Sequence, residues 1–128
     1  MCTEHRSRNL WKLTAIYTRI MKFDKRVRFA ALVNPNGRIL DGGMREGLQP
    51  IEPLERTPEL IAKLISVQKS EDLAEFFGKQ EYSILLHEEV AALIFRSRKK
   101  FILVTADKKL PLNKVPGLRK LAMEWKHD

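Results

Sequence analysis

The chain has 128 residues, of which 44% are hydrophobic and 31% are charged, and its formal net charge is +8. A chain of this size and composition is typical of one soluble domain whose core needs no disulfide or metal. The lone Cys2 excludes an internal disulfide and favours a reducing compartment, and no apolar run approaches the ~20 residues of a transmembrane helix. The first residues contain no apolar core typical of a signal peptide. We therefore expect a single cytoplasmic domain over residues 1–128, with residues 1–8 as a flexible tail.

The first third of the chain predicts a helix followed by a β-hairpin. From Asn9 to Met21, apolar residues recur at spacings of three and four, which indicates an amphipathic helix. Val27–Val33 is apolar and of strand length, and the turn sequence Asn34-Pro35-Asn36-Gly37 follows it. Pro suits the second position of such a turn, and Gly37 can adopt a positive φ. Residues 38–40 then form the second strand of the hairpin.

A glycine-containing loop and a long helix come next. Residues 41–47 are predicted to be a flexible exit from the hairpin, since this glycine cluster does not lead into a helix N-terminus that could bind phosphate. A helix is predicted over 57–77, with Thr57 as its cap, Pro58 at its first position and an apolar stripe along its length. Ser70 provides a second capping signal, so a kink or a restart at this point is left open.

The run from Glu81 to Asp107 predicts an antiparallel meander, and the rest of the chain packs around it. Three apolar stretches of strand length, 82–86, 90–95 and 101–105, are separated by charged breaks too short for anything but hairpin turns. A connection containing two prolines, 110–117, precedes a short amphipathic helix that runs from Leu118 to Trp125. The fold class is therefore α+β, a five-stranded antiparallel sheet with helices on its faces, in the order α-β-β-α-β-β-β-α.

This order of elements resembles the roadblock (dynein light chain) family, whose fold is related to the profilin-like and longin-like folds. The resemblance covers nearly the whole chain and is most specific over 31–40, which is similar to the family's first hairpin, and over 100–121, which is similar to its last strand and exit. Leu112-Asn113 and the Val115-Pro116-Gly117 break depart from the family's Asn-Leu-Gly-like step. The resemblance implies a non-enzymatic adaptor that forms homodimers through the middle helix and the following strand. It also implies regulation of a small Ras-like GTPase, as some family members show.

Two features of the residues themselves favour a homodimer. The helix over 57–77 has more apolar positions than one sheet face needs. The strand over 82–86, which the resemblance implies is an edge strand, contains no Pro or Lys to protect it from pairing. The predicted interface draws on both elements and consists of Leu60, Leu64, Val67, Phe76, Tyr82, Ile84 and Leu86.

The charge is distributed unevenly along the chain. Residues 1–28 carry a balance of +6, residues 29–95 a balance of −5 and residues 96–128 a balance of +7. Such a distribution is typical either of a face, built from both termini, that attracts nucleic acid or an anionic membrane, or of an ordinary solvated face. The cluster of Arg96, Arg98, Lys99 and Lys100 is predicted to be an exposed turn and a candidate anion-contact patch, because no adjacent acid neutralises it.

No catalytic, cofactor-binding or metal-binding residues are predicted. His87-Glu88-Glu89 lacks the second His that a zinc-protease helix needs, and His5 and His127 lie at opposite termini. An alternative to the adaptor is a small-molecule sensor of PAS or profilin type. It would require a roomy pocket under the loop over 42–46.

Overall fold

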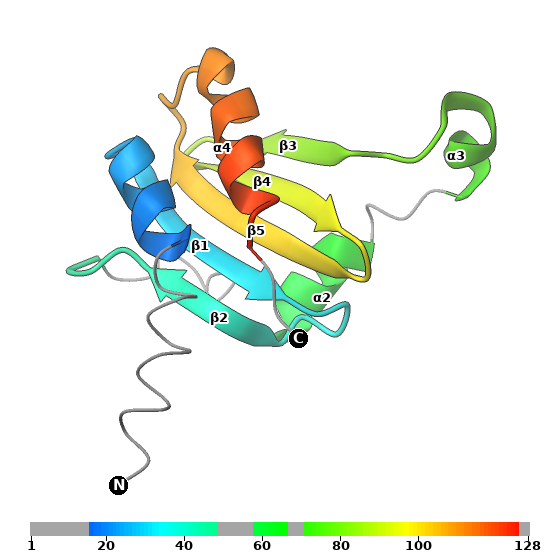
Figure 1. Ribbon diagram of the computed structural model, residues 1–128, viewed down its shortest axis with the longest axis horizontal. Coiled ribbons are helices and arrows are strands. Elements are labelled where there is room, and N and C mark those ends of the chain that lie inside the picture. The colour runs from blue at the N-terminus through cyan, green and yellow to red at the C-terminus, as the bar shows by residue number, and fades with distance from the viewer. Residues whose placement is uncertain (1–15, 49–57, 67–70, 126–128) are drawn as a thin grey trace, which may run out of the picture.

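The computed structural model describes residues 16–48, 58–66 and 71–125. Five strands form one antiparallel sheet in the order β2-β1-β5-β4-β3 (Figure 1). The strands are β1 (Val27–Val33), β2 (Ile39–Met44), β3 (Tyr82–Leu86), β4 (Val90–Ser97) and β5 (Lys100–Asp107). The helices are an unlabelled helix that includes residues 16–23, α2 (Pro58–Ser66), α3 (Glu71–Phe77), the short 3-10 helix η2 (Leu112–Lys114) and α4 (Val115–Ala122). The α+β class and the antiparallel meander are confirmed.

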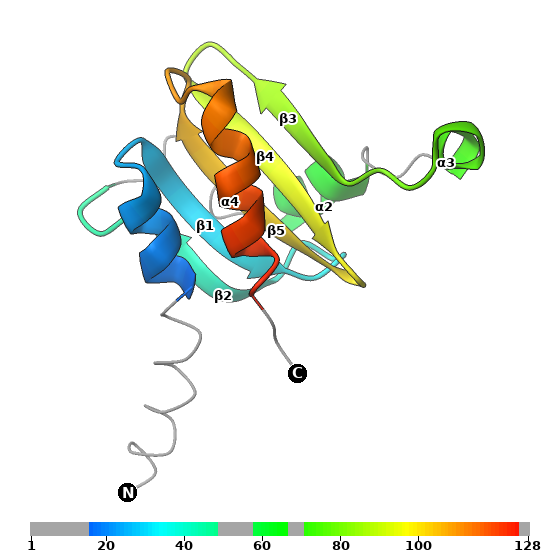
Figure 2. The same cartoon turned by 45° about the horizontal axis from the view of Figure 1, so that its top comes forward.

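Helices cover both faces of the sheet. The helix over 16–23 and α4 lie on one face and α2 lies on the other, as Figures 1 and 2 show together. The first face buries Ile20, Leu93, Phe95, Ile102, Val104, Leu118 and Trp125, among others. The second buries Phe29, Ile61, Ile65, Ile94 and Leu103, among others. Because β1, β4 and β5 are covered on both sides, their sequences are continuous apolar runs.

The β1–β2 hairpin has the predicted turn. Gly37 has a φ of 84°, and its N–H donates to the carbonyl of Asn34 at 2.9 Å. The Asn34 carboxamide oxygen accepts hydrogen bonds from the N–H groups of Asn36 and Arg38, both at 3.0 Å. An Asn side chain that bonds its own turn in this way is a local determinant of structure, which is why the sequence predicts it well.

The expectation that residues 41–47 form a flexible exit is wrong for Asp41–Met44, which continue β2. Gly42 has a φ of 94°, and a Cβ there would lie 2.1 Å from the Ala30 carbonyl oxygen and 2.9 Å from Trp125. Trp125 is buried, and its indole Nε1 donates to Asp41 Oδ2 at 2.9 Å. The glycine therefore permits a close approach between β2 and the C-terminal segment, which local sequence does not reveal.

The predicted helix over 57–77 is present as two separate helices, α2 and α3. Figure 1 places α3 well beyond the end of the sheet, whereas α2 lies against it. Two further boundaries are corrected. The helix α4 begins at Val115, inside the expected connection, and ends at Ala122, so Trp125 lies beyond it. The tail over 1–8, the helix start at Asn9, the Thr57 cap and Ser70 lie outside the described residues.

The β4–β5 hairpin is tighter than its sequence suggests. Register pairing continues to Ser97 opposite Lys100, so only Arg98 and Lys99 form the loop. The five-residue break from Arg96 to Lys100 is thus mostly strand. In the part of the chain that the structure describes, no helix is long and apolar enough to cross a membrane.

Candidate interaction surfaces

The strand β3 forms an open edge of the sheet. It pairs with β4 on one side and is last in the strand order, so no strand among the described residues pairs with its other side. The His87 N–H donates to the Val90 carbonyl, and the Glu81 carbonyl accepts from the Arg96 N–H. Backbone direction alternates along an antiparallel strand. The N–H and C=O groups of Tyr82, Ile84 and Leu86 therefore point outward, toward the open edge.

The side chains of the same three residues lie on the face of β3 that α4 leaves partly uncovered. Leu86 is 69% exposed, whereas Tyr82 and Ile84 are each 37% exposed. Tyr82 packs against Phe95 with a ring-centroid distance of 5.8 Å. The guanidinium of Arg119 lies 5.6 Å from the Tyr82 ring centroid and pairs with Glu81 at 2.8 Å. One end of the edge is thus tied to α4, while the Leu86 end is open.

The helix α3 precedes this strand and carries an exposed apolar surface. Phe76 is 79% exposed, Phe77 is 83% exposed and Leu73 is 54% exposed. Gly78, with a φ of 85°, ends the helix by donating its N–H to the Ala74 carbonyl. Single exposed apolar residues are ordinary, but three within two turns of one short helix form a local apolar surface.

The structure brings only part of the predicted dimer interface to the surface. Phe76, Tyr82, Ile84 and Leu86 are exposed. Leu64 is half-buried and packs against the core cluster beneath α2. Val67 and the side chain of Leu60 lie outside the described residues.

A cluster of cations occupies one end of the sheet, where the β1–β2 and β4–β5 hairpins lie next to each other. We call this the basic end, and it comprises Arg38, Arg96, Arg98, Lys99 and Lys100. Lys100 is half-buried and the other four are exposed, which confirms the predicted exposure of the cluster, although only Arg98 and Lys99 form the turn itself. The hairpins are adjacent because Val33, at the end of β1, pairs with Phe101, at the start of β5. The Arg96 guanidinium lies 5.9 Å from the Phe101 ring centroid.

Arg98 has an unusual backbone conformation. Its φ is 57°, and it is the one non-glycine residue with a positive φ in the described part of the chain. Side chains with a Cβ disfavour this region by roughly 1–2 kcal/mol, and a two-residue hairpin with positive φ at its first loop position normally uses glycine there. The loop therefore holds an arginine where the backbone favours glycine.

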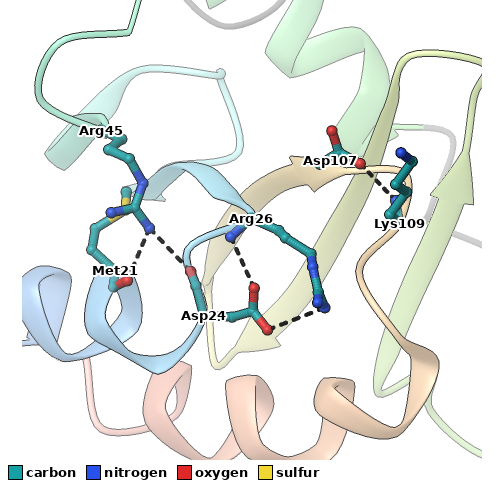
Figure 3. Close-up of polar contacts among 6 residues, drawn as sticks. All are labelled: Met21, Asp24, Arg26, Arg45, Asp107 and Lys109. Atoms are coloured by element: carbon teal, nitrogen blue, oxygen red, sulfur yellow. Dashed lines mark hydrogen bonds and ion pairs between the residues drawn. The ribbon is translucent and has the colours of Figure 1, made fainter.

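The opposite end of the sheet also carries cations, but acids organise it. We call it the Asp-turn end, where the turns Asp24-Lys25-Arg26 and Asp107-Lys108-Lys109 meet (Figure 3). The Asp24 carboxylate accepts from the Arg26 N–H at 2.8 Å, and the Asp107 carboxylate accepts from the Lys109 N–H at 2.8 Å. The two turns touch through the Asp107 N–H, which donates to the Arg26 carbonyl at 2.8 Å.

Arg45 ties this end together. Its guanidinium donates to the carbonyls of Met21 and Asp24 at 2.9 and 3.0 Å (Figure 3), and it also donates to the Val27 carbonyl at 2.7 Å. Met21 lies near the end of the first helix, where carbonyls have no intrahelical partner and a cation is favourable. A single side chain therefore joins the residues after β2 to the first helix and to β1.

Two surface depressions lie beside Tyr17, near the place where a sensor pocket was expected. One, of about 510 Å³, is lined by Tyr17, Lys22, Lys25, Arg45 and Glu46, among others. The other, of about 250 Å³, is lined by Tyr17 and residues 41–44. The Tyr17 hydroxyl donates to the Met44 carbonyl, and burial raises the pKa of this hydroxyl above its ordinary value. Both depressions are open to solvent, and the buried Trp125 lies against Gly42. In the described ranges, no group of three or more His, Cys, Asp or Glu residues could hold a metal ion.

Comparison with known proteins identifies the fold. No protein-family model and no curated protein sequence matches the chain. Among solved structures, an MglB with a tetrameric arrangement matches with a TM-score of 0.67 and 14% identity, covering 90% of each chain. MglB from Myxococcus xanthus matches with a TM-score of 0.65 and 16% identity, covering 88% of this chain and 93% of that one. A Roadblock/LC7 domain from Streptomyces avermitilis matches with a TM-score of 0.61 and 12% identity, covering 89% of this chain and 90% of that one.

The chain has a roadblock-like fold. The expectation from its element order and hairpin sequences is thus confirmed at the level of architecture.

Sequence reasoning missed some residues of the surfaces on this roadblock-like domain. Leu73 and Phe77 are not in the predicted interface, although both are exposed on α3 together with Phe76. Arg38 was not grouped with the β4–β5 cations, since only the β1–β5 pairing brings it there. A local signal did exist for the Asp-turn end. Both turns read Asp-Lys followed by Lys or Arg, and an Asp side chain readily bonds the backbone two residues on.

Proposed function

We propose that this chain is a non-enzymatic cytoplasmic adaptor whose copies pair through the β3 edge to form a homodimer. The observation that carries the proposal is the open edge itself. Its outward backbone groups and the exposed side chains of Tyr82, Ile84 and Leu86 offer both hydrogen bonds and apolar area to a second strand. The roadblock-like fold supports it, because the resemblance to that family implies dimers built on this strand.

Antiparallel pairing about Ile84 is self-complementary. It places Tyr82 of one copy opposite Leu86 of the other, so that the outward N–H and C=O groups face one another. Beyond the strand, the same register brings Lys79 close to the exposed Glu88-Glu89 turn of the second copy. Opposite charges thus favour this register at both ends of the edge.

The helix α3 supplies apolar area that the strand alone lacks. Stable interfaces bury about 1,600 Å² in total, and a buried Phe side chain contributes roughly 150–250 Å². Phe76 and Phe77 are almost fully available for such burial, and they lie directly before the edge strand in the chain. Helix and strand are therefore two neighbouring sources of apolar area in the chain that a second copy can bury.

The direct test is molecular mass in solution. Light scattering at micromolar concentration is expected to give twice the chain mass of 14.9 kDa. Leu86→Glu introduces a charge at an exposed edge position and is expected to give monomers with unchanged thermal stability of the fold. Leu48→Glu is the matched control, because Leu48 is exposed and follows β2, which is the opposite edge strand of the sheet. A monomeric parent protein, or a dimer that survives Leu86→Glu, would contradict the proposal.

We further propose that the dimer regulates or scaffolds a small Ras-like GTPase, on the strength of the family resemblance. Calorimetry with purified GTPases from the source cell, loaded with GDP or with a GTP analogue, measures the affinity of the protein for each nucleotide state. The parent protein is expected to bind one nucleotide state more tightly, and the Leu86→Glu monomer is expected to bind neither. Equal binding of both variants would separate the GTPase contact from the dimer, and no binding by either would reject the GTPase role.

A further inference from the structure

We propose that the basic end is an electrostatic docking surface for an anionic lipid bilayer. This inference does not depend on the dimer or on a GTPase. It starts from the charge balance of the two adjacent hairpins, residues 34–38 and 96–100. These residues include five cations and no Asp or Glu. Clusters of about four to eight Lys and Arg residues at a surface are typical of binding to anionic lipids.

The head groups of these cations are available to a partner. Within the described ranges, no hydrogen bond or ion pair holds the side chains of Arg38, Arg98, Lys99 or Lys100. Glu81 lies opposite Arg96, since its carbonyl accepts from the Arg96 N–H, but its carboxylate is paired with Arg119 on α4. Among the described residues, no ion pair therefore neutralises the positive charge of this end.

The conformation of Arg98 adds an independent observation. At a φ of 57° a glycine would fit without strain, yet the loop carries an arginine whose side chain forms no hydrogen bond or ion pair with the described residues. If the turn had only a structural role, glycine would be the favoured residue at this position. An arginine at the tip of the hairpin is favourable if the tip contacts an anionic partner.

The shape of the basic end favours a flat partner over a grooved one. Register pairing with β1 extends to Phe101 and pairing within the hairpin ends at Ser97 and Lys100, so the hairpin projects only slightly beyond its neighbour. The major groove of DNA is about 12 Å wide and admits a projecting two-stranded ribbon, which this blunt end is not. Single-stranded nucleic acid is held by exposed aromatic side chains, and Phe101, the aromatic of this end, is buried. Cations without fixed contacts suit a diffuse layer of lipid head groups.

Vesicle sedimentation of the full chain tests the proposal. We expect it to bind vesicles in which phosphatidylserine replaces about a third of the phosphatidylcholine, and not vesicles of phosphatidylcholine alone. Binding should disappear when salt is raised from about 0.1 M to about 1 M, since the screening length falls from about 10 Å to about 3 Å. The double variant Arg38→Gln/Lys99→Gln is expected to weaken binding by roughly 25-fold, about fivefold for each cation removed.

The matched control changes the net charge equally at the other end of the sheet. Lys108→Gln/Lys109→Gln removes two exposed cations from the Asp-turn end and is expected to weaken vesicle binding by less than about threefold. An equal loss in both double variants would show that only net charge matters and would overturn the proposal. So would the absence of vesicle binding, or binding of a DNA duplex that is tighter than vesicle binding and lost in Arg38→Gln/Lys99→Gln.

Discussion

The two ends of the sheet carry similar numbers of cations but use them differently. At the Asp-turn end, each cation-bearing turn contains an aspartate whose carboxylate bonds the turn's own backbone, and Arg45 donates only to carbonyls. At the basic end, neither turn segment (residues 34–38 and 96–100) contains an acid, and Arg98 has a backbone conformation that its side chain disfavours. The comparison indicates that the first end uses charge to build the fold, whereas the second leaves charge for a partner.

The largest expected effect comes from removing Arg45. Arg45→Met keeps the apolar stem but leaves the carbonyls of Met21, Asp24 and Val27 without their donor. We expect the free energy of unfolding to fall by about 2–3 kcal/mol, since hydrogen bonds to charged groups contribute about 1.5–3 kcal/mol and these are only partly buried. Urea denaturation measures this change in the free energy of unfolding. Arg38→Met at the basic end is the control, and its unfolding free energy should stay within about 0.5 kcal/mol of the parent.

A smaller effect is expected from the aspartates. Asp107→Ala removes the acceptor of the Lys109 N–H and should cost about 1 kcal/mol of unfolding free energy. Asp107→Asn removes the same charge but keeps a side-chain oxygen that can accept this bond, so it should cost much less. If both variants lose the same amount, charge rather than turn geometry stabilises this end, and the contrast between the two ends weakens.

The smallest expected effect concerns the loop of the basic end. Here the sign of the change in unfolding free energy is the test. Arg98→Gly should raise the unfolding free energy by about 0.5 kcal/mol, because relief of a positive φ exceeds the greater flexibility of glycine in the unfolded chain. Lys99→Gly should lower it by a similar amount, since Lys99 is not in that conformation. If the denaturant midpoints of both variants shift in the same direction, the backbone of Arg98 is not strained.

Several elements were predictable because their determinants are local. The turn at Asn34–Gly37 is held by its own Asn side chain, and the meander is encoded by apolar stretches of strand length. The exposed β4–β5 turn followed from four cations within five residues without an acid. The roadblock-like architecture followed from the order of these elements.

Other features depend on contacts between residues far apart in the chain. Residues 41–44 contain two glycines and look like a loop, but pairing with β1 and the packing of Trp125 on Gly42 make them a strand. One interpretation of the charge distribution is a single basic face built from both termini, but the two cationic clusters lie at opposite ends of the sheet. Pairing of β1 with β5 brings residues 24–26 to 107–109, whereas Arg96–Lys100 lies at the opposite end of the sheet.

The sequence by itself determined the elements, their order and the exposure of the cationic turn, because hydrophobic period and turn chemistry act over a few residues. Only the tertiary structure decided which strand is left at an edge, which apolar residues of 57–77 enter the core, and which cations are neutralised by neighbouring acids. Each of these depends on which strands pair and in what register. Pairing is set by burial of the whole sheet between its helices, and no single stretch of the chain contains that information.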